Sequence, residues 1–439
     1  MTVRPHTIVV DLGFGDAGKG TVVDRLCARG PEPVHAVVRF NGGAQAAHNV
    51  VTDDGRHHTF AQFGSGTFTP GVRTHLSRFV LVDPLALAAE ADHLAAVGVP
   101  DAFARLTVDE RALLVTPYHR AANRARELAR GAARHGSCGM GIGETAAYAL
   151  THPTEAPRAA DCHSPTRLNR VLTALHDRYR AEFPDGPPVP PAEDCAKAFQ
   201  AFADRVTLVD DTYLAALLAA GPVVFEGAQG VLLDEDHGFH PHTTWSTTTF
   251  KNAEALLAES GTTRPSQRLG VLRTYTTRHG PGPFVTEDPT LTLPDPHNTK
   301  NPWQGTFRVG HLDEVALRYA AEACGGIDAL AITHMDVAAS NPDLLRCTAY
   351  ELPDEQNPLT RLPHHNDLTT REHLTTRLLT ARPIYEPLGD PITAAETATN
   401  APAVLLSHGP RTSDKHWTGA GRPSHAAFGA ANHAASGAV

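Results

Sequence analysis

HTIVVDLGFGDAGKGTVVDRL, residues 6–26, contains the first strand, loop and helix expected in this chain. The run from His6 to Leu12 is short, β-branched and bounded by glycine, which predicts a strand. From Thr21 to Arg29 apolar residues recur at helical spacing, which predicts a helix. A strand, a glycine-rich loop and a helix in that order are typical of a site that binds phosphate.

The same order of elements recurs further along the chain. GPVVFEGAQG, residues 221–230, contains a predicted buried strand from Val223 to Glu226 that ends in a loop. Residues 313–337 predict a helix closed by Gly325 and Gly326, followed by a strand from Ile327 to Thr333. Strands that alternate with helices indicate an α/β fold with a large, mainly parallel central sheet flanked by helices, similar to P-loop NTPases. Ligand loops are expected at the carboxyl ends of the strands.

Composition narrows the class of protein. The formal net charge of −10 argues against nucleic-acid and anionic-membrane partners, because both need a basic protein surface. No segment has the length of a signal sequence or a membrane span, so we expect a cytoplasmic protein. The six cysteines are scattered without CxxC pairs, so neither a disulfide framework nor a zinc knuckle is indicated.

The glycine-rich loop departs from a Walker A loop at two positions. Gly20 follows Lys19 where a Walker A loop has Ser or Thr, and Asp16 lies among the glycines. Phosphates repel a carboxylate unless a cation bridges them or the carboxylate accepts a proton from the substrate. Asp16 therefore suggests Mg²⁺ chemistry or a general base. The alternative is a glycine-rich turn with an exposed lysine.

Five further stretches occur in a recognisable order: FNGGAQAAHNVV (40–51), GSCGMGIGETAAY (136–148), FEGAQGVLLDEDHGFHPHTTWSTTT (225–249), YTTRHGPGPFVTE (275–287) and RVGHLDEVALRYA (308–320). Together with GDAGKG they resemble the adenylosuccinate synthetases. That resemblance implies a ligase that couples GTP hydrolysis to joining the amino group of aspartate to C6 of inosine monophosphate, a 6-oxopurine nucleotide. It also implies Mg²⁺ as cofactor and a homodimer.

The resemblance assigns roles to individual residues. Asp16 is implied as the base that removes the N1 proton, Lys19 as a phosphate contact, His48 as a support of the transferring phosphoryl group and Gln229 as the contact to the 6-oxo edge. Mg²⁺ ligands are implied at Asp16 and the Ala47 carbonyl. The implied GTP-binding residues are Gly15, Gly18, Lys19, Gly20, Thr21, Asp336, Ser407 and Gly409. The implied purine-nucleotide-binding residues are Gln45, Cys138, Gln229, Thr244, Arg278 and Gly280, and the implied amino-acid-binding residues are Lys300, Gln304 and Arg308.

The resemblance covers residues 1–411, which we expect to form one domain. Within it we expect a helical excursion over about residues 84–220 and a substrate loop over about residues 286–307, because that segment is long, polar and without periodicity. From residue 412 the sequence turns to Gly, Ala, Ser and His, so residues 412–439 are expected to be a flexible tail.

The pattern also departs from the family. Where the family has Thr-Thr-Gly followed by several arginines that hold the carboxylates of aspartate, this chain has NPWQGTFRVG, residues 301–310, with Arg308 alone. The amino donor therefore stays open between aspartate and another amine. Near the expected guanine site His334 replaces a lysine and Arg411 replaces an acidic residue, so ATP is not excluded as the phosphate donor.

Three alternatives remain at this point. A specialised paralogue would keep the activation step and change the amine or the carbonyl acceptor, as in secondary metabolism. A nucleotide sensor would bind without catalysis. A metal site at His237, His240 and His242 in HGFHPH would ligate zinc or iron.

Overall fold

The structure is a computed structural model that describes residues 4–419 except 30–31, 132–133, 135, 294, 296–302 and 304. Its centre is a sheet of ten strands in the order β17-β16-β13-β9-β1-β8-β2-β5-β6-β7. The strands are β1 His6–Asp11, β2 Ala36–Arg39, β5 Arg73–Leu76, β6 Leu106–Asp109, β7 Thr207–Val209, β8 Val223–Glu226, β9 Ser266–Arg273, β13 Ala329–Thr333, β16 Ala403–Ser407 and β17 Lys415–Trp417. Neighbouring strands pair in parallel except β16 and β17, so the predicted mainly parallel α/β sheet is confirmed.

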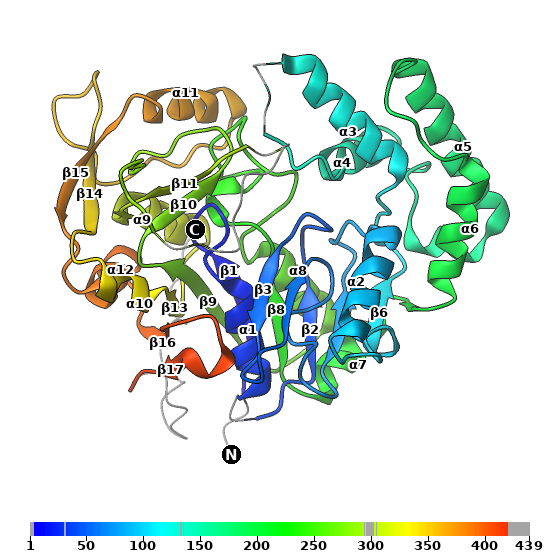
Figure 1. The fold of residues 1–439 in the computed structure, drawn as a ribbon, viewed down its shortest axis with the longest axis horizontal. Coiled ribbons are helices and arrows are strands. Elements are labelled where there is room, and N and C mark those ends of the chain that lie inside the picture. The colour runs from blue at the N-terminus through cyan, green and yellow to red at the C-terminus, as the bar shows by residue number, and fades with distance from the viewer. Residues whose placement is uncertain are drawn as a thin grey trace, which may run out of the picture.

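Helices cover the sheet and extend beyond it (Figure 1). They are α1 Lys19–Ala28, α2 Pro84–Ala96, α3 Pro117–Arg130, α4 Ile142–Thr151, α5 Pro165–Glu182, α6 Ala192–Ala203, α7 Tyr213–Ala220, α8 Lys251–Ser260, α9 Glu314–Ala323, α10 Met335–Ser340, α11 Leu368–Leu378 and α12 Pro391–Thr399. Smaller sheets pair β3 His48–Val51 with β4 His57–Phe60, β10 Thr276–His279 with β11 Phe307–Gly310, and β14 Leu345–Glu351 with both β12 Leu312–Asp313 and β15 Arg382–Pro387.

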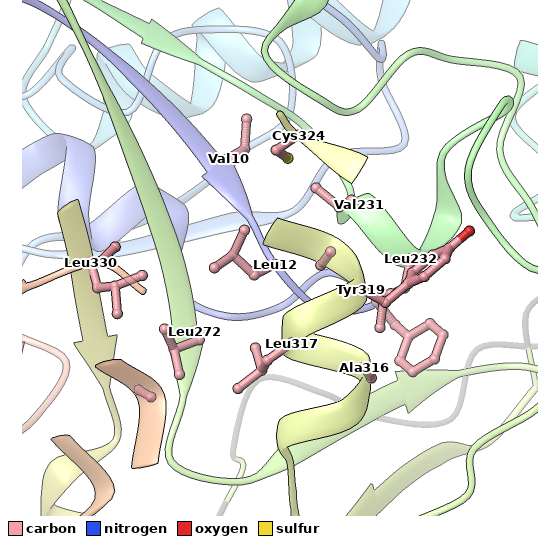
Figure 2. Packing of buried hydrophobic residues seen from close by; sticks show 14 of the residues in the cluster. Val10, Leu12, Val231, Leu232, Leu272, Ala316, Leu317, Tyr319, Cys324 and Leu330 are labelled. Carbon is pink, nitrogen blue, oxygen red and sulfur yellow. The ribbon is translucent and has the colours of Figure 1, made fainter. Parts of the chain in front are cut away.

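All six residues of strand β1 are buried because both of its faces are covered, and its centre is the apolar run Ile8, Val9 and Val10. Val10 and Leu12 pack with Leu317 of α9 in one hydrophobic cluster, and Figure 2 shows these side chains between the strand and that helix. Val9 points to the other face, where it packs with Val22 of α1. The period of two along a strand thus divides one sequence run between two cores.

The predicted helical excursion contains α2 to α7 but also two strands of the central sheet, β6 and β7. These strands are only four and three residues long, which is too short for a clear period in the sequence. Helices α2, α3, α5 and α6 share a hydrophobic cluster with β6. Figure 1 places α3 to α6 together beside that end of the sheet, with β14, β15 and α11 at the opposite end.

The predicted start of the flexible tail is too early. Residues 415–417 form β17, which pairs with β16, and the buried Lys415 Nζ donates hydrogen bonds to the carbonyl oxygens of Gly409 at 3.0 Å and Arg411 at 2.6 Å. Burial of a lysine in a short polar stretch is hard to predict from the sequence. Residues 420–439, the rest of the predicted tail, lie outside the described residues. None of the helices described here is long and apolar enough to cross a membrane.

Candidate active site

One cavity of ≈ 1050 Å³ lies at the edge of the sheet where the parallel strands end. Loops that follow β1, β2, β8, β9, β13 and β16 supply its wall, as expected for ligand sites in parallel sheets. The predicted site residues on the wall are Gly15, Asp16, Gly18, Lys19, Gly20, Thr21, Gln45, Ala47, His48, Cys138, Gln229, Thr244, Arg278, Asp336, Ser407 and Gly409. Cys138 comes from the connection between α3 and α4, so residues from distant segments of the chain meet in one space.

Asp11, the last residue of β1, organises the glycine-rich loop. Its carboxylate accepts hydrogen bonds from the backbone N–H groups of Gly13 and Ala17, both at 2.8 Å, and forms an ion pair with Lys19 Nζ at 3.1 Å. The loop turns through positive φ angles at Gly15 (97°), Asp16 (62°) and Gly18 (91°). A carboxylate at the strand end thus fixes both the loop backbone and the lysine.

The contact between Gly20 and His48 explains why the residue after Lys19 is glycine. A Cβ at Gly20 would lie 2.7 Å from His48 Cβ and 3.1 Å from Ser65 Oγ. Real Cβ atoms do not approach that closely, so the Ser or Thr of a Walker A loop has no room here. The loop lacks that hydroxyl and makes close contact with the His48 backbone in its place.

His48 is held by a buried carboxylate. Its Nδ1 lies 2.6 Å from Glu226 Oε1, and Glu226 also accepts hydrogen bonds from the Ser65 N–H at 2.9 Å and from the Ser65 hydroxyl. Burial opposes ionisation of Glu226, but the charge of Arg39 and these hydrogen bonds bring its pKa down to about 2. The carboxylate therefore accepts, so the imidazole carries its proton on Nδ1 and Nε2 is the remaining nitrogen.

Burial lowers the pKa of His48 to about 4, although Glu226 opposes that shift. The site thus holds a neutral imidazole against an ionised glutamate. A negative charge placed against Nε2 would favour the imidazolium, which the glutamate is positioned to stabilise. The pair resembles the base and orienting carboxylate of other catalytic arrangements.

Asp16 combines a left-handed backbone with a carboxylate that is 26% exposed in the cavity. Its Oδ2 lies 3.4 Å from His279 Nε2 of β10, and its backbone carbonyl accepts a hydrogen bond from Arg273 Nε at 2.6 Å. Burial raises the pKa of Asp16, against the opposing charges of His279, Arg273 and Lys19. A raised carboxyl pKa makes the group a better proton acceptor near neutral pH.

Two glutamine amides in the cavity wall lack a hydrogen-bond partner within the described chain. Both amide atoms of Gln45 and the Oε1 of Gln229 are buried from solvent without such a partner. Gln229 also has a positive φ of 59°. Its surroundings are tightly packed, since a Cβ at Gly42 would lie 2.6 Å from the Cβ of Ala228, the residue before Gln229. Since buried polar groups are normally paired, these amides fit a ligand with both donors and acceptors, such as the edge of a heterocycle.

Arg278 is 2% exposed, and its guanidinium is part of the cavity wall and is not free to bind a ligand. Its guanidinium donates to the carbonyl oxygens of Pro281 at 3.1 Å and Pro283 at 2.8 Å, and it lies 4.2 Å from the centre of the Phe14 ring. It therefore shapes the loop that contains Gly280. Gly280 itself does not line the cavity, although Pro281 does.

The other end of the cavity has the composition of a base pocket. Asp336, Ser407, Gly409 and Pro410 line it, and Asp336 is exposed there. His334 precedes this aspartate and takes a left-handed backbone with φ 59°. Burial lowers the pKa of His334 well below its usual value, so this wall contributes a neutral ring where the family has a lysine.

The residues predicted to bind the amino acid are not brought to the cavity in the part of the chain that is described. Arg308 donates to Glu287 at 2.8 Å and to the carbonyl oxygens of Gly280 at 2.7 Å and Gly282 at 3.0 Å, and it does not line the cavity. Lys300 and Gln304 lie outside the described residues.

The histidines of HGFHPH do not assemble a metal site in the described residues, where no three His, Cys, Asp or Glu side chains are placed to hold one ion. His240 pairs with Glu372 of α11 at 3.1 Å, and the ring of His237 packs against His364. The described structure gives the three-histidine alternative no support.

Sequence reasoning missed Asp11, Glu226, Arg273, His279 and Asp295. Glu226 ends one predicted strand and Asp11 is the second-last residue of another, and a carboxylate near the end of a strand was the available signal. Arg273 and Asp295 carry no such signal, because their partners lie far away in the sequence.

Comparison with known proteins gives a consistent result. Residues 8–408 match the family model described as adenylosuccinate synthetase. The adenylosuccinate synthetase of Desulfovibrio desulfuricans is 33% identical over 388 residues, which cover 83% of this chain and 88% of the relative. That of Myxococcus xanthus is 34% identical over 401 residues, which cover 88% of this chain and 87% of the relative.

Two solved structures share the fold. The fully ligated adenylosuccinate synthetase of Plasmodium falciparum superimposes with a TM-score of 0.78 at 20% identity, covering 94% of this chain and all of that one. The succinoaminodeoxyadenylate synthetase of cyanophage S-2L, bound to dGMP and dATP, gives a TM-score of 0.54 at 17% identity, covering 95% of this chain and 96% of that one. At these identities the likeness concerns the fold alone.

Proposed function

Because this chain belongs to the adenylosuccinate synthetase family, whose members ligate inosine monophosphate and aspartate using GTP, we propose that it activates the 6-oxo group of a purine nucleotide. It is a ligase that forms a carbon–nitrogen bond. One observation carries the assignment of the site, which is that Asp16, Lys19, His48 and Gln229 line the same cavity.

The proposed reaction has two steps that balance. Asp16 takes the proton from N1 of the purine, the 6-oxo oxygen attacks the γ-phosphorus of GTP, and the bond between that phosphorus and the β-phosphate oxygen breaks to leave GDP. The amine then attacks C6 and displaces inorganic phosphate, and the proton that the amine loses passes to solvent. The base must lie within hydrogen-bond reach of its proton, and in this proposal the loop that carries Asp16 also binds the γ-phosphate, which brings base and phosphate together.

Each remaining residue has a task in this scheme. The Lys19 ammonium and the N–H groups at the start of α1 bind phosphate oxygens. His48, oriented by Glu226, supports the charge that develops on the transferring phosphoryl group. Gln229 meets the 6-oxo edge with its unpaired amide oxygen and its amide nitrogen, while Gln45, Cys138 and Thr244 meet the rest of the nucleotide.

The residues present fit Mg²⁺ together with phosphates. Asp16 offers a partly exposed carboxylate, and Ala47, which is exposed on the cavity wall, offers a carbonyl oxygen. Mg²⁺ usually binds proteins through one or two such oxygens and takes its other ligands from phosphates and water. When bound it neutralises charge on the triphosphate. We propose GTP in preference to ATP, because the exposed carboxylate of Asp336 can accept both N1–H and the exocyclic amine of guanine.

A second candidate keeps the activation step and changes the amine. The Lys and Arg side chains on the described wall are already engaged: Lys19 by Asp11, Arg126 by Glu144 and Glu182, Arg130 by Glu127, Arg273 by Asp295 and Arg278 by backbone carbonyls. The two carboxylates of aspartate would need new partners, and a donor with fewer charges would not.

We also propose a homodimer that acts in the cytoplasm, and light scattering of the purified protein tests the dimer.

The central test measures phosphate release from GTP with inosine monophosphate and a panel of amino acids that includes aspartate. Aspartate-dependent release supports the first candidate, and release with another amine alone supports the second. Asp16→Asn is expected to abolish turnover while leaving GTP binding largely intact. Turnover equal to that of the parent protein would remove Asp16 from its role, and the absence of release with every amine would favour a nucleotide sensor.

A further inference from the structure

We propose that Arg273 is the positioning residue of the base: its guanidinium holds the backbone of Asp16 in place and joins it to Asp295. This inference rests on the proposed function, in which Asp16 removes the N1 proton. Arg273 is the last residue of β9, the strand next to β1 in the sheet, so its side chain lies beside the loop that follows β1. It lines the cavity and is 6% exposed.

Three hydrogen bonds fix the guanidinium. Nε donates to the carbonyl oxygen of Asp16 at 2.6 Å, and Nη1 donates to the hydroxyl of Tyr275 at 2.7 Å and to Asp295 Oδ2 at 2.9 Å. The planar fork presents these donors in a fixed relation. The position of the Asp16 carbonyl is therefore set by Arg273, which Tyr275 and Asp295 hold in turn.

Asp16 needs such support because of its backbone. Its φ of 62° lies in the left-handed region, which residues with a Cβ adopt uncommonly and at a cost, so contacts that hold this backbone stabilise it. Asp11 holds the N–H groups of Gly13, Gly15 and Ala17, which flank Asp16. Arg273 acts on Asp16 itself. The Asp16 carbonyl and the Ala17 N–H belong to one peptide unit, which Arg273 and Asp11 therefore hold from its two sides. Without Arg273 the loop loses one of these two anchors, and a shift of about 1 Å of the loop with its carboxylate would take the base out of reach of its proton.

The ion pair with Asp295 completes the arrangement. A guanidinium buried without a carboxylate would carry an uncompensated charge. That charge would attract the carboxylate of Asp16 away from the cavity. The Asp295 carboxylate, whose side chain is 11% exposed, satisfies that charge from the other side. The Asp16 carbonyl thus accepts a hydrogen bond from a guanidinium whose charge is already paired with Asp295. The Asp16 carboxylate faces the cavity and His279.

The experiment compares arginine variants on one strand. Arg273→Met is expected to lower kcat on the order of 100-fold while the dissociation constant for GTP changes by no more than about threefold, because the phosphate contacts are untouched. Arg273→Lys keeps the charge but loses the fork, so its kcat is expected between those of Met and the parent protein. Arg268→Met is the matched control, since Arg268 lies on β9, pairs with Glu254 at 2.7 Å and does not line the cavity.

A rescue measurement separates positioning from a merely structural role. Arg273→Gly leaves a gap in the cavity wall, and added guanidinium chloride is expected to restore part of its kcat where potassium chloride at equal ionic strength does not. A melting-temperature loss without any rescue would overturn the proposal, as would an Arg273→Met kcat within about twofold of the parent protein.

Failure of this inference can be told apart from failure of the proposed function. If Asp16→Asn abolishes turnover while Arg273→Met retains it, only the role of Arg273 falls. If Asp16→Asn retains turnover, or the parent protein releases no phosphate with any amine, the proposed function falls and takes the inference with it.

Discussion

Glu226→Gln is expected to slow phosphoryl transfer without weakening the binding of GTP. The parent carboxylate serves three donors, which are His48 Nδ1 at 2.6 Å, the Ser65 N–H at 2.9 Å and the Ser65 hydroxyl. A glutamine amide has one oxygen to accept with and places its NH₂ against one of these donors. It also removes the negative charge that would stabilise an imidazolium at His48.

The size of the effect follows from the hydrogen bond that loses its charged acceptor. Hydrogen bonds to charged groups contribute about 1.5–3 kcal/mol. If His48 gains charge only as the phosphoryl group transfers, that energy is lost from the transition state alone, and since 1.36 kcal/mol is tenfold in rate, kcat is expected to fall about 10- to 150-fold. The KM for GTP should stay near its parent value.

Glu90→Gln provides the matched control. Glu90 is also buried, and its carboxylate accepts from the backbone N–H groups of Ala61, Gln62 and Phe63, but it does not line the cavity. Steady-state phosphate release and thermal melting are measured for both variants. Both should lose stability, and only Glu226→Gln should lose kcat. A Glu226→Gln kcat equal to that of the control would refute the reasoning.

Four further outcomes are expected. Gly20→Ala should lower the melting temperature and kcat, because the clash with His48 outweighs the gain in helix propensity of about 1 kcal/mol, whereas Gly419→Ala, which meets nothing within 4 Å, should change neither. Lys415→Met should weaken GTP binding about tenfold, because the carbonyls of Gly409 and Arg411 lose their buried donor, while the KM of the purine nucleotide stays unchanged. Removal of Mg²⁺ with EDTA should abolish phosphate release, and added MgCl₂ should restore it; release in excess EDTA would contradict the assigned Mg²⁺ site. The free energy of unfolding should fall between pH 7 and pH 5, because histidines with a lowered folded pKa bind protons less readily than the unfolded chain does, at a cost of about 2 kcal/mol each. These histidines are His6, His48 and His75, each with a pKa lowered by burial to about 4, and His119, lowered to about 3. Asp24 and Asp313, raised by burial to about 6, act in the opposite direction but are fewer, and urea titrations at both pH values that found equal stability would contradict the balance.

The fold class and several of its elements were predictable because their signals are local. The strand from Val223 to Glu226 was predicted with the bounds that the structure has, and the helix after the glycine-rich loop starts two residues earlier than predicted. Short strands such as β7 were missed, since three residues carry no period. The helical excursion was therefore predicted without the strands that anchor it to the sheet.

The candidate site was predictable only where a motif carries the chemistry. Asp16, Lys19 and His48 stand in recognisable stretches, and the structure brings them to one cavity. The partners that orient them were not predictable. Glu226 lies 178 residues from His48, and Arg273 lies 257 residues from Asp16.

Local sequence was sufficient for the alternation of strands and helices and for the glycine-rich loop, because each depends on neighbours within a few residues. The membership of the chemical groups in one site was predicted from the resemblance of six stretches to a known family. The room beside Gly20, the carboxylate behind His48 and the guanidinium behind Asp16 depend on which strand ends become neighbours in a parallel sheet. Strand order is fixed by the packing of two apolar cores around the sheet, and that packing is a property of the whole chain.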